Sequence, residues 1–160
     1  MKKVIFAKRE SVEQVEEGNF LAPKFDFDGI MPAVVTETSS GEVLMLGYMN
    51  AESLTKTIET KEAYYWSRSR ERLWKKGESS GMVHNVDEIL IDDDQDSILL
   101  KVTIDGLGAS CHVGYKSCFY RSIPLGTIND AEKVEMKFEE KEKKFDPEEV
   151  YKGQPNPTKL

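Results

Sequence analysis

The chain has 160 residues and a formal net charge of −7 at pH 7. This length fits one domain with a buried core, and a content of 32% charged and 9% aromatic residues excludes a disordered chain. So acidic a chain lacks the basic surface that a general nucleic-acid binder needs to displace counterions from phosphates. We therefore expect a soluble globular protein that binds no nucleic acid.

The start of the chain gives no indication of export. Residues 1–10 become charged before a secretory hydrophobic stretch develops, and no apolar run approaches the roughly 20 residues that cross a bilayer. We expect a cytoplasmic protein that is not inserted in a membrane. In that compartment Cys111 and Cys118 are better interpreted as a metal-binding or catalytic pair than as a structural disulfide.

The first half of the chain alternates strand and turn signals. The first twenty residues are polar and acidic, and we expect a helix or an arm at the periphery. Residues 30–37 and 42–48 predict two strands, and the Ser-Ser-Gly sequence at 39–41 predicts the turn of a hairpin between them.

Asn50 predicts the start of a helix over residues 51–60, because its side chain can cap the first turn. Leu54 and Ile58 then lie on one face of that helix. The aromatic run at 63–67 predicts a further strand.

Two more extended segments follow, at residues 82–91 and 97–104, with an acidic run at 92–96 between them. The whole pattern predicts one α+β domain of mostly antiparallel strands and hairpins with a few helices. We expect its core at about residues 25–121, and a peripheral tail beyond Arg121.

Four aspartates stand among the five residues 92–96, and their mutual repulsion favours a bound cation. In extended backbone Asp92, Asp94 and Asp96 would face one side and Asp93 the other. Three oxygen ligands on one side suit Mg²⁺. The alternative is a solvated hairpin tip. A calcium loop of the EF-hand type is excluded, because Ser97 stands at its glycine position and Thr103 at its glutamate position.

A basic stretch at residues 68–76 carries five cationic side chains against the single acid Glu71, a local charge of +4. It suits a small, multiply charged anion better than a long polyanion. The alternative is a solvated surface strand. The cationic residues are Arg68, Arg70, Arg72, Lys75 and Lys76.

Cys111 and Cys118 bracket a glycine-containing segment that can fold back to present two thiolates to one zinc ion, and His112 is adjacent. With two cysteines a closed four-cysteine site within one chain is impossible. A zinc ion here would need other donors, which favours a catalytic site with an open position. The alternative is a pair of buried, inert cysteines.

Four ordered blocks resemble the phosphoribosyl-AMP cyclohydrolase family of histidine biosynthesis, which opens the purine ring of its substrate. The resemblance covers roughly residues 25–121. The blocks are GEVLMLGYMN at 41–50, YWSRSR with LWKKGE at 65–78, the aspartate run at 92–96, and SCH with SCF at 110–119.

The resemblance implies an intertwined homodimer with active sites at the subunit interface. It implies Mg²⁺ on Asp92, Asp94 and Asp96, and a catalytic Zn²⁺, held partly across the interface, on Cys111 and Cys118. Asp93 stands where the family usually has a third zinc-ligating cysteine, and our hypothesis is that its carboxylate replaces that thiolate. Alternatively His112, or His84 from either chain, completes the site.

A second departure from the family is Met82, which stands where a polar residue is usual. His84, two places later, shares a strand face with it, so the imidazole can serve the same site. The alternative is a buried His84 with satisfied hydrogen bonds.

The implied reaction is hydrolysis of the bond between N1 and C6 of the adenine ring of phosphoribosyl-AMP by zinc-activated water. Proton transfer needs a group that titrates near pH 7, for which we expect His112 first and His84 second. Arg68, Arg70 and Lys76 would bind the phosphates together with Mg²⁺. Two alternatives are a Mg²⁺-dependent nucleotide phosphohydrolase and a non-catalytic metal-binding relative.

Overall fold

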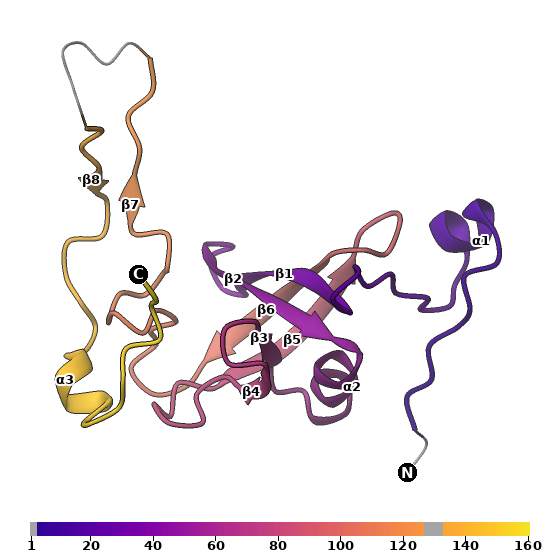
Figure 1. Cartoon of the computed structure of the whole chain (residues 1–160), viewed down its shortest axis with the longest axis horizontal. Helices are drawn as coiled ribbons and strands as arrows, with labels where there is room; N and C mark the ends of the chain where they lie inside the picture. Colours follow the sequence, from indigo (N-terminus) through magenta and orange to yellow (C-terminus); the bar gives the residue numbers. More distant parts are fainter. Residues whose placement is uncertain (1–2, 127–132) are drawn as a thin grey trace.

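The computed structural model describes residues 3–126 and 133–160. Residues 1–2 and 127–132, which belong to the expected arm and tail, lie outside the described residues. A four-stranded sheet in the order β2-β1-β6-β5 forms the centre of the molecule (Figure 1). Its strands are β1 (Ile30–Glu37), β2 (Val43–Asn50), β5 (His84–Ile91) and β6 (Ile98–Ile104).

The sheet consists of two antiparallel hairpins joined side by side. β1 pairs with β2 and β5 pairs with β6, as the strand and turn signals predicted. The hairpins meet through a parallel pairing of β1 with β6, in which Val35 lies opposite Leu100. The expected α+β fold of mostly antiparallel strands is confirmed, and this central parallel pairing is an addition to it.

Helix α2 (Ala51–Thr60) follows β2 directly and begins with a capping box. The Asn50 side chain accepts a hydrogen bond from the Ser53 amide at 2.8 Å, and the Ser53 hydroxyl accepts one from the Asn50 amide at 2.8 Å. The predicted helix and its cap are therefore confirmed. Leu54 is buried in the core with residues of β1, β2 and β6.

The aromatic run and the basic stretch form one small hairpin, β3 (Tyr64–Ser67) with β4 (Arg72–Lys75). Tyr65 is buried in the main core, and its ring lies 5.5 Å from the ring of Trp74 on the partner strand. The hairpin thus anchors the basic side chains next to the sheet.

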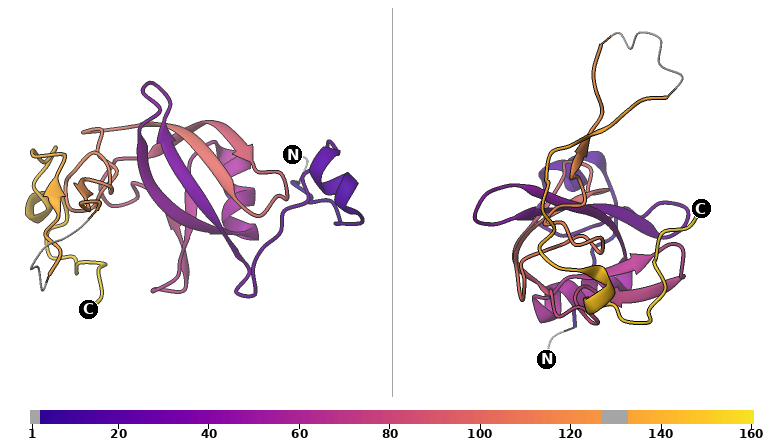
Figure 2. Two further views of the ribbon diagram at one scale, coloured as in Figure 1. Left: turned by 90° about the horizontal axis from the view of Figure 1, so that it is seen from above. Right: turned by 90° about the vertical axis from the view of Figure 1, so that its left-hand side faces the viewer.

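Both end segments lie outside the sheet, at opposite ends of the molecule (Figure 2). The N-terminal segment holds the short helix α1 (Val12–Glu17). The C-terminal segment holds β7 (Arg121–Ser122), β8 (Lys137–Phe138) and α3 (Pro147–Val150).

The C-terminal segment, expected to be peripheral, also makes buried contacts. Phe145 is buried and packs against Met82 and Ala109 in a second small core. A tail of charged residues and prolines gave no indication of this contact. None of the helices in the described ranges has the length and apolar character needed to cross a bilayer.

Candidate active site

A cavity of about 800 Å³ lies beside the β3–β4 hairpin. Its walls come from that hairpin, from the turn at residues 77–80, from the segment around the cysteines and from the C-terminal segment 147–158. Chemically active side chains from distant parts of the sequence therefore meet in one space. They include Arg70, Lys76, Ser110, His112, Cys118 and Asn156.

The two cysteines lie in a loop, here called the cysteine loop (residues 110–118), that closes on itself and on the sheet. The Cys111 amide donates a hydrogen bond to the Tyr115 carbonyl at 3.1 Å. The Cys118 amide donates one to the Leu44 carbonyl of β2 at 2.7 Å. These bonds hold both ends of the loop, and the two thiols come into hydrogen-bonding contact.

The contact between the thiols makes them chemically different. The hydrogen bond with Cys118 lowers the pKa of Cys111 to about 7, although burial acts in the opposite direction. The same contact and burial raise the pKa of Cys118. The positive charge of Lys76 favours the thiolate form of both, so the pair readily supplies a thiolate, the form of cysteine that binds metals.

His112 presents an unpartnered nitrogen. Its Nε2 atom is buried and has no hydrogen-bond partner among the described residues. Burial, and then the charge of Lys76, lower the pKa of His112, while a hydrogen bond with the Asn156 side chain opposes them. A neutral imidazole with a free nitrogen is ready to accept a proton or to bind a metal.

His84 is completely buried, and both of its ring nitrogens are hydrogen-bonded. Nδ1 lies 3.1 Å from the Tyr65 hydroxyl, and Nε2 lies 3.1 Å from the Ser110 hydroxyl. Burial, and then the charge of Lys76, lower its pKa to about 3. This geometry matches the alternative of a satisfied core histidine, and His84 is not among the residues that line the cavity.

The three cationic residues expected at the substrate have different surroundings. Arg70 lines the cavity, and its Nε donates to the Ser67 hydroxyl at 3.1 Å. Arg68 is exposed and stacks on the Tyr48 ring at 4.0 Å, outside the cavity lining. Lys76 is buried, and its ammonium group donates a hydrogen bond to the Ser110 carbonyl at 2.5 Å.

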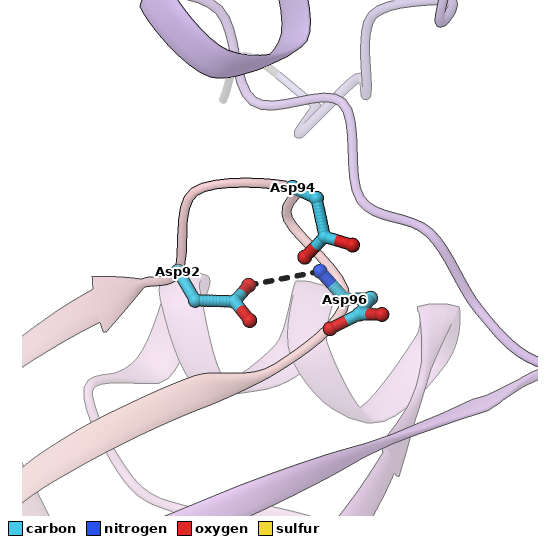
Figure 3. Close-up of side chains that lie close together, drawn as sticks. All are labelled: Asp92, Asp94 and Asp96. Carbon is cyan, nitrogen blue, oxygen red and sulfur yellow. Dashed lines mark hydrogen bonds between the residues drawn. The ribbon is translucent and has the colours of Figure 1, made fainter. Parts of the chain in front are cut away.

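Asp92, Asp94 and Asp96 come together at the end of the β5–β6 hairpin (Figure 3). Each has a carboxylate oxygen within 4.8 Å of the other two, whereas Asp93 is exposed and not part of the group. The expected grouping is thus present, although a turn produces it and not extended backbone.

Hydrogen bonds stabilise this turn, and the pKa values of Asp92 and Asp96 shift in opposite directions. Asp92 Oδ1 accepts the amides of Asp96 and Ser97, both at 3.0 Å. Burial raises the pKa of Asp92, but bonds from the Ser97 hydroxyl and from these amides outweigh it and lower the pKa overall. Burial, and then the charges of Asp94 and Asp92, raise the pKa of Asp96.

The aspartate group and the cysteine loop lie at opposite ends of β6. Among the described residues, no third His, Cys, Asp or Glu joins Cys111 and Cys118 to make a group of three. Asp93 of the same chain therefore does not complete a group of metal ligands with these thiols.

Both donor sets fit the expected metals. Three close carboxylates offer the oxygen ligands that Mg²⁺ prefers. Two thiols in contact offer two zinc ligands, and no third donor of the described residues joins them, so the set is incomplete within one chain.

The sequence did not predict several contacts around the candidate site. Tyr65 and Ser110 fix the ring of His84, and the Glu140 carboxylate accepts the amides of Lys116 at 2.6 Å and Ser117 at 3.2 Å. Ser110 belongs to the Ser-Cys-His motif at residues 110–112, but Glu140 lies in a charged segment whose sequence gave no indication of this contact. Its contact forms because the C-terminal segment folds back onto the cysteine loop, and local sequence patterns do not predict such a long-range contact.

Comparison with known proteins finds the same family that the four sequence blocks resemble. The sequence model of the family described as phosphoribosyl-AMP cyclohydrolase matches residues 45–120. The phosphoribosyl-AMP cyclohydrolase of Rhodopseudomonas palustris strain HaA2 is 49% identical over 152 residues, which cover 91% of this chain and 95% of that protein. That of Chelativorans sp. strain BNC1 is 54% identical over 111 residues, 69% of this chain and 80% of that protein. The chain belongs to the phosphoribosyl-AMP cyclohydrolase family.

Proposed function

We propose that the chain hydrolyses the N1–C6 bond of the adenine ring of phosphoribosyl-AMP, a step of histidine biosynthesis. The observation that carries the proposal is the meeting of three groups at one cavity: Cys118, whose thiol contacts that of Cys111, His112 with an Nε2 that has no partner among the described residues, and Arg70. Ring opening needs a hydroxide source, a proton donor and a cation for the phosphate, and these groups suit the three tasks.

Cys111 and Cys118 would hold Zn²⁺, which supplies a bound water with a pKa near neutrality. Their chain contributes two thiolates, and a further donor has to come from elsewhere. The partner subunit's Asp93 is our choice, because Asp93 is exposed and does not join the thiols of its own chain. The proposal therefore includes a homodimer with a site at the interface.

His112 would move the proton. Its Nε2 faces no competing partner within the described residues, so it can accept a proton and then pass it to N1 of the ring. His84 has both nitrogens occupied by Tyr65 and Ser110, and we assign it to holding Ser110 in place.

Arg70 would bind the substrate phosphate, with Arg68 as an outer charge and Mg²⁺ on Asp92, Asp94 and Asp96 as a further cation. Lys76 differs from the other two cations because it is buried beside the thiols. We assign it to stabilising the thiolates and the Ser110 carbonyl.

The direct test incubates the purified chain with phosphoribosyl-AMP, Zn²⁺ and Mg²⁺ and follows the ultraviolet change of ring opening. Cys111→Ser and Cys118→Ser should each abolish turnover and lower the zinc content measured by atomic absorption. Full turnover by a zinc-free variant would contradict the zinc role. Release of inorganic phosphate without ring opening would instead indicate the Mg²⁺-dependent phosphohydrolase, and absence of any reaction the non-catalytic relative.

A further inference from the structure

Gln95 is a buried residue inside the acidic turn at residues 92–97. It is 5% exposed, and its side chain reaches the N-terminal arm, defined here as residues 7–24. Gln95 Oε1 accepts the Ala22 amide at 2.7 Å, and Gln95 Nε2 donates to the Val15 carbonyl at 2.9 Å. Both polar ends of the amide are therefore used by the arm.

The backbone of Gln95 adds a third connection and an unusual conformation. Its carbonyl accepts the Lys24 amide at 2.7 Å. Its φ of 59° lies in the left-handed region, where glycine is the least strained residue. A glutamine at this position requires compensation, and the two side-chain hydrogen bonds supply it.

Arg9 forms a second tie between the arm and the turn. Its Nη2 donates to the Asp94 carbonyl at 2.9 Å, and its Nη1 donates to the Ala22 carbonyl at 2.6 Å. The arm passes beside the turn that carries the three aspartates (Figure 3). Asp94 and Gln95, the two residues that precede Asp96, are thus both fixed from outside the hairpin.

This support matters because three carboxylates within 4.8 Å repel one another. Without a cation, a free turn would relax by moving Asp94 and Asp96 apart. The left-handed residue between them sets the direction of the chain, and the Asp96 amide then reaches Asp92 Oδ1.

We propose that Gln95 and Arg9 are positioning residues for the divalent cation at Asp92, Asp94 and Asp96, so that the N-terminal arm sets the affinity for Mg²⁺. Neither residue touches the cation. The inference rests on the magnesium role in the proposed function. It extends that role to a segment that lies outside the matched family region at residues 45–120.

The test measures Mg²⁺ binding to the full chain by isothermal titration calorimetry, which needs no turnover. Gln95→Gly keeps the left-handed backbone accessible and removes both side-chain bonds. Loss of such outer contacts typically weakens metal binding about tenfold or more, and we expect that change. Lys61→Gly is the matched control, because Lys61 is also left-handed at φ 60° but is exposed and distant from the turn. Its Mg²⁺ affinity should equal that of the unmodified chain.

A readout of the reaction separates positioning from general loss of structure. In Gln95→Gly, the Mg²⁺ concentration for half-maximal ring opening should rise by the same factor, and excess Mg²⁺ should restore kcat. If Gln95→Gly does not fold, Arg9→Lys keeps the charge and loses the forked contact, and it should also weaken Mg²⁺ binding.

Unchanged Mg²⁺ affinity in a folded Gln95→Gly chain overturns the inference, as does unchanged affinity in Arg9→Lys where Gln95→Gly fails to fold. If the underlying magnesium role is wrong, the titration gives a different result. In that case the unmodified chain itself shows no Mg²⁺ binding that Asp94→Ala removes.

Discussion

His84 illustrates how burial changes the pKa of a histidine. The sequence placed it on a strand face and left open whether it acts in catalysis or packs in the core. Its ring nitrogens bond to Tyr65 and Ser110, and its pKa falls to about 3 because of burial and the nearby Lys76 charge. The folded protein therefore keeps this imidazole neutral well below pH 6.

This neutrality predicts a pH-dependent stability. Between about pH 6.5, where a histidine in the unfolded chain titrates, and about pH 3, the unfolded state binds the extra proton. The free energy of unfolding should fall as pH is lowered through this window, by up to about 1.4 kcal/mol per pH unit from this group. Urea titrations of the metal-free chain test this against His84→Gln, which should lack that part of the slope. Equal slopes would show that His84 is protonated in the folded state.

Asp93 gives the second prediction at the residue scale, because it stands where the family usually has a cysteine. If the partner's Asp93 completes the zinc site, Asp93→Cys should preserve activity, since a thiolate is the usual ligand. Asp93→Ala should weaken zinc binding by at least about 10-fold to 100-fold, because loss of an outer partner of a metal ligand already costs that much. Zinc competition with a chromogenic chelator measures both. Unchanged zinc affinity in Asp93→Ala would place the missing donor elsewhere.

At the scale of elements, the cysteine loop depends on the C-terminal segment. Gly114 has a φ of 106°, and a Cβ there would lie 2.4 Å from the Phe145 carbonyl oxygen. The Gly114 carbonyl also accepts the Lys144 amide at 2.7 Å. Glycine is thus required for the segment to pack against the loop that carries the thiols.

Gly114→Ala should lower the free energy of unfolding by about 1 to 3 kcal/mol, because strain and a backbone clash combine. It should also expose the segment around Phe145 to limited proteolysis. Gly153→Ala is the control, since its φ of 70° is also left-handed but a Cβ there meets open space. Equal loss of stability in the two variants would show that strain alone matters and that the contact with Phe145 does not.

At the scale of the molecule, the sequence predicted what depends on neighbours along the chain. The two hairpins and the capped helix after Asn50 follow from alternation, turn residues and spacing. The aspartates group as expected, but through a turn and not through the extended backbone on which their alternation was argued. The parallel pairing of β1 with β6 joins residues more than sixty positions apart, and no local pattern encodes it. The burial of Lys76 and the approach of Asn156 to His112 also depend on contacts between distant parts of the chain.

The aspartate turn precedes β6 and the cysteine loop follows it, and no aspartate joins the two thiols among the described residues, which carries a prediction about assembly. If the active site is shared between two subunits, one chain supplies the aspartates and the other the thiols. Cys118→Ser and Asp94→Ala homodimers should then each be nearly inactive. After mixing and subunit exchange, half of the dimers combine one chain of each kind. Each such dimer has one intact site, so activity should return to about a quarter of the unmodified level.

The ring-opening assay before and after exchange measures this recovery, and sedimentation velocity verifies the dimer. Mixing Cys118→Ser with Cys111→Ser is the matched control, because both changes remove thiols of the same loop. That mixture should stay inactive, since every site lacks one thiol whichever chains combine. Recovery in the control would mean that the two thiols of one site come from different chains. No recovery in the test mixture would mean that each chain holds a complete site. The distance between the aspartates and the thiols within one chain would then have to close by a large movement of the cysteine loop.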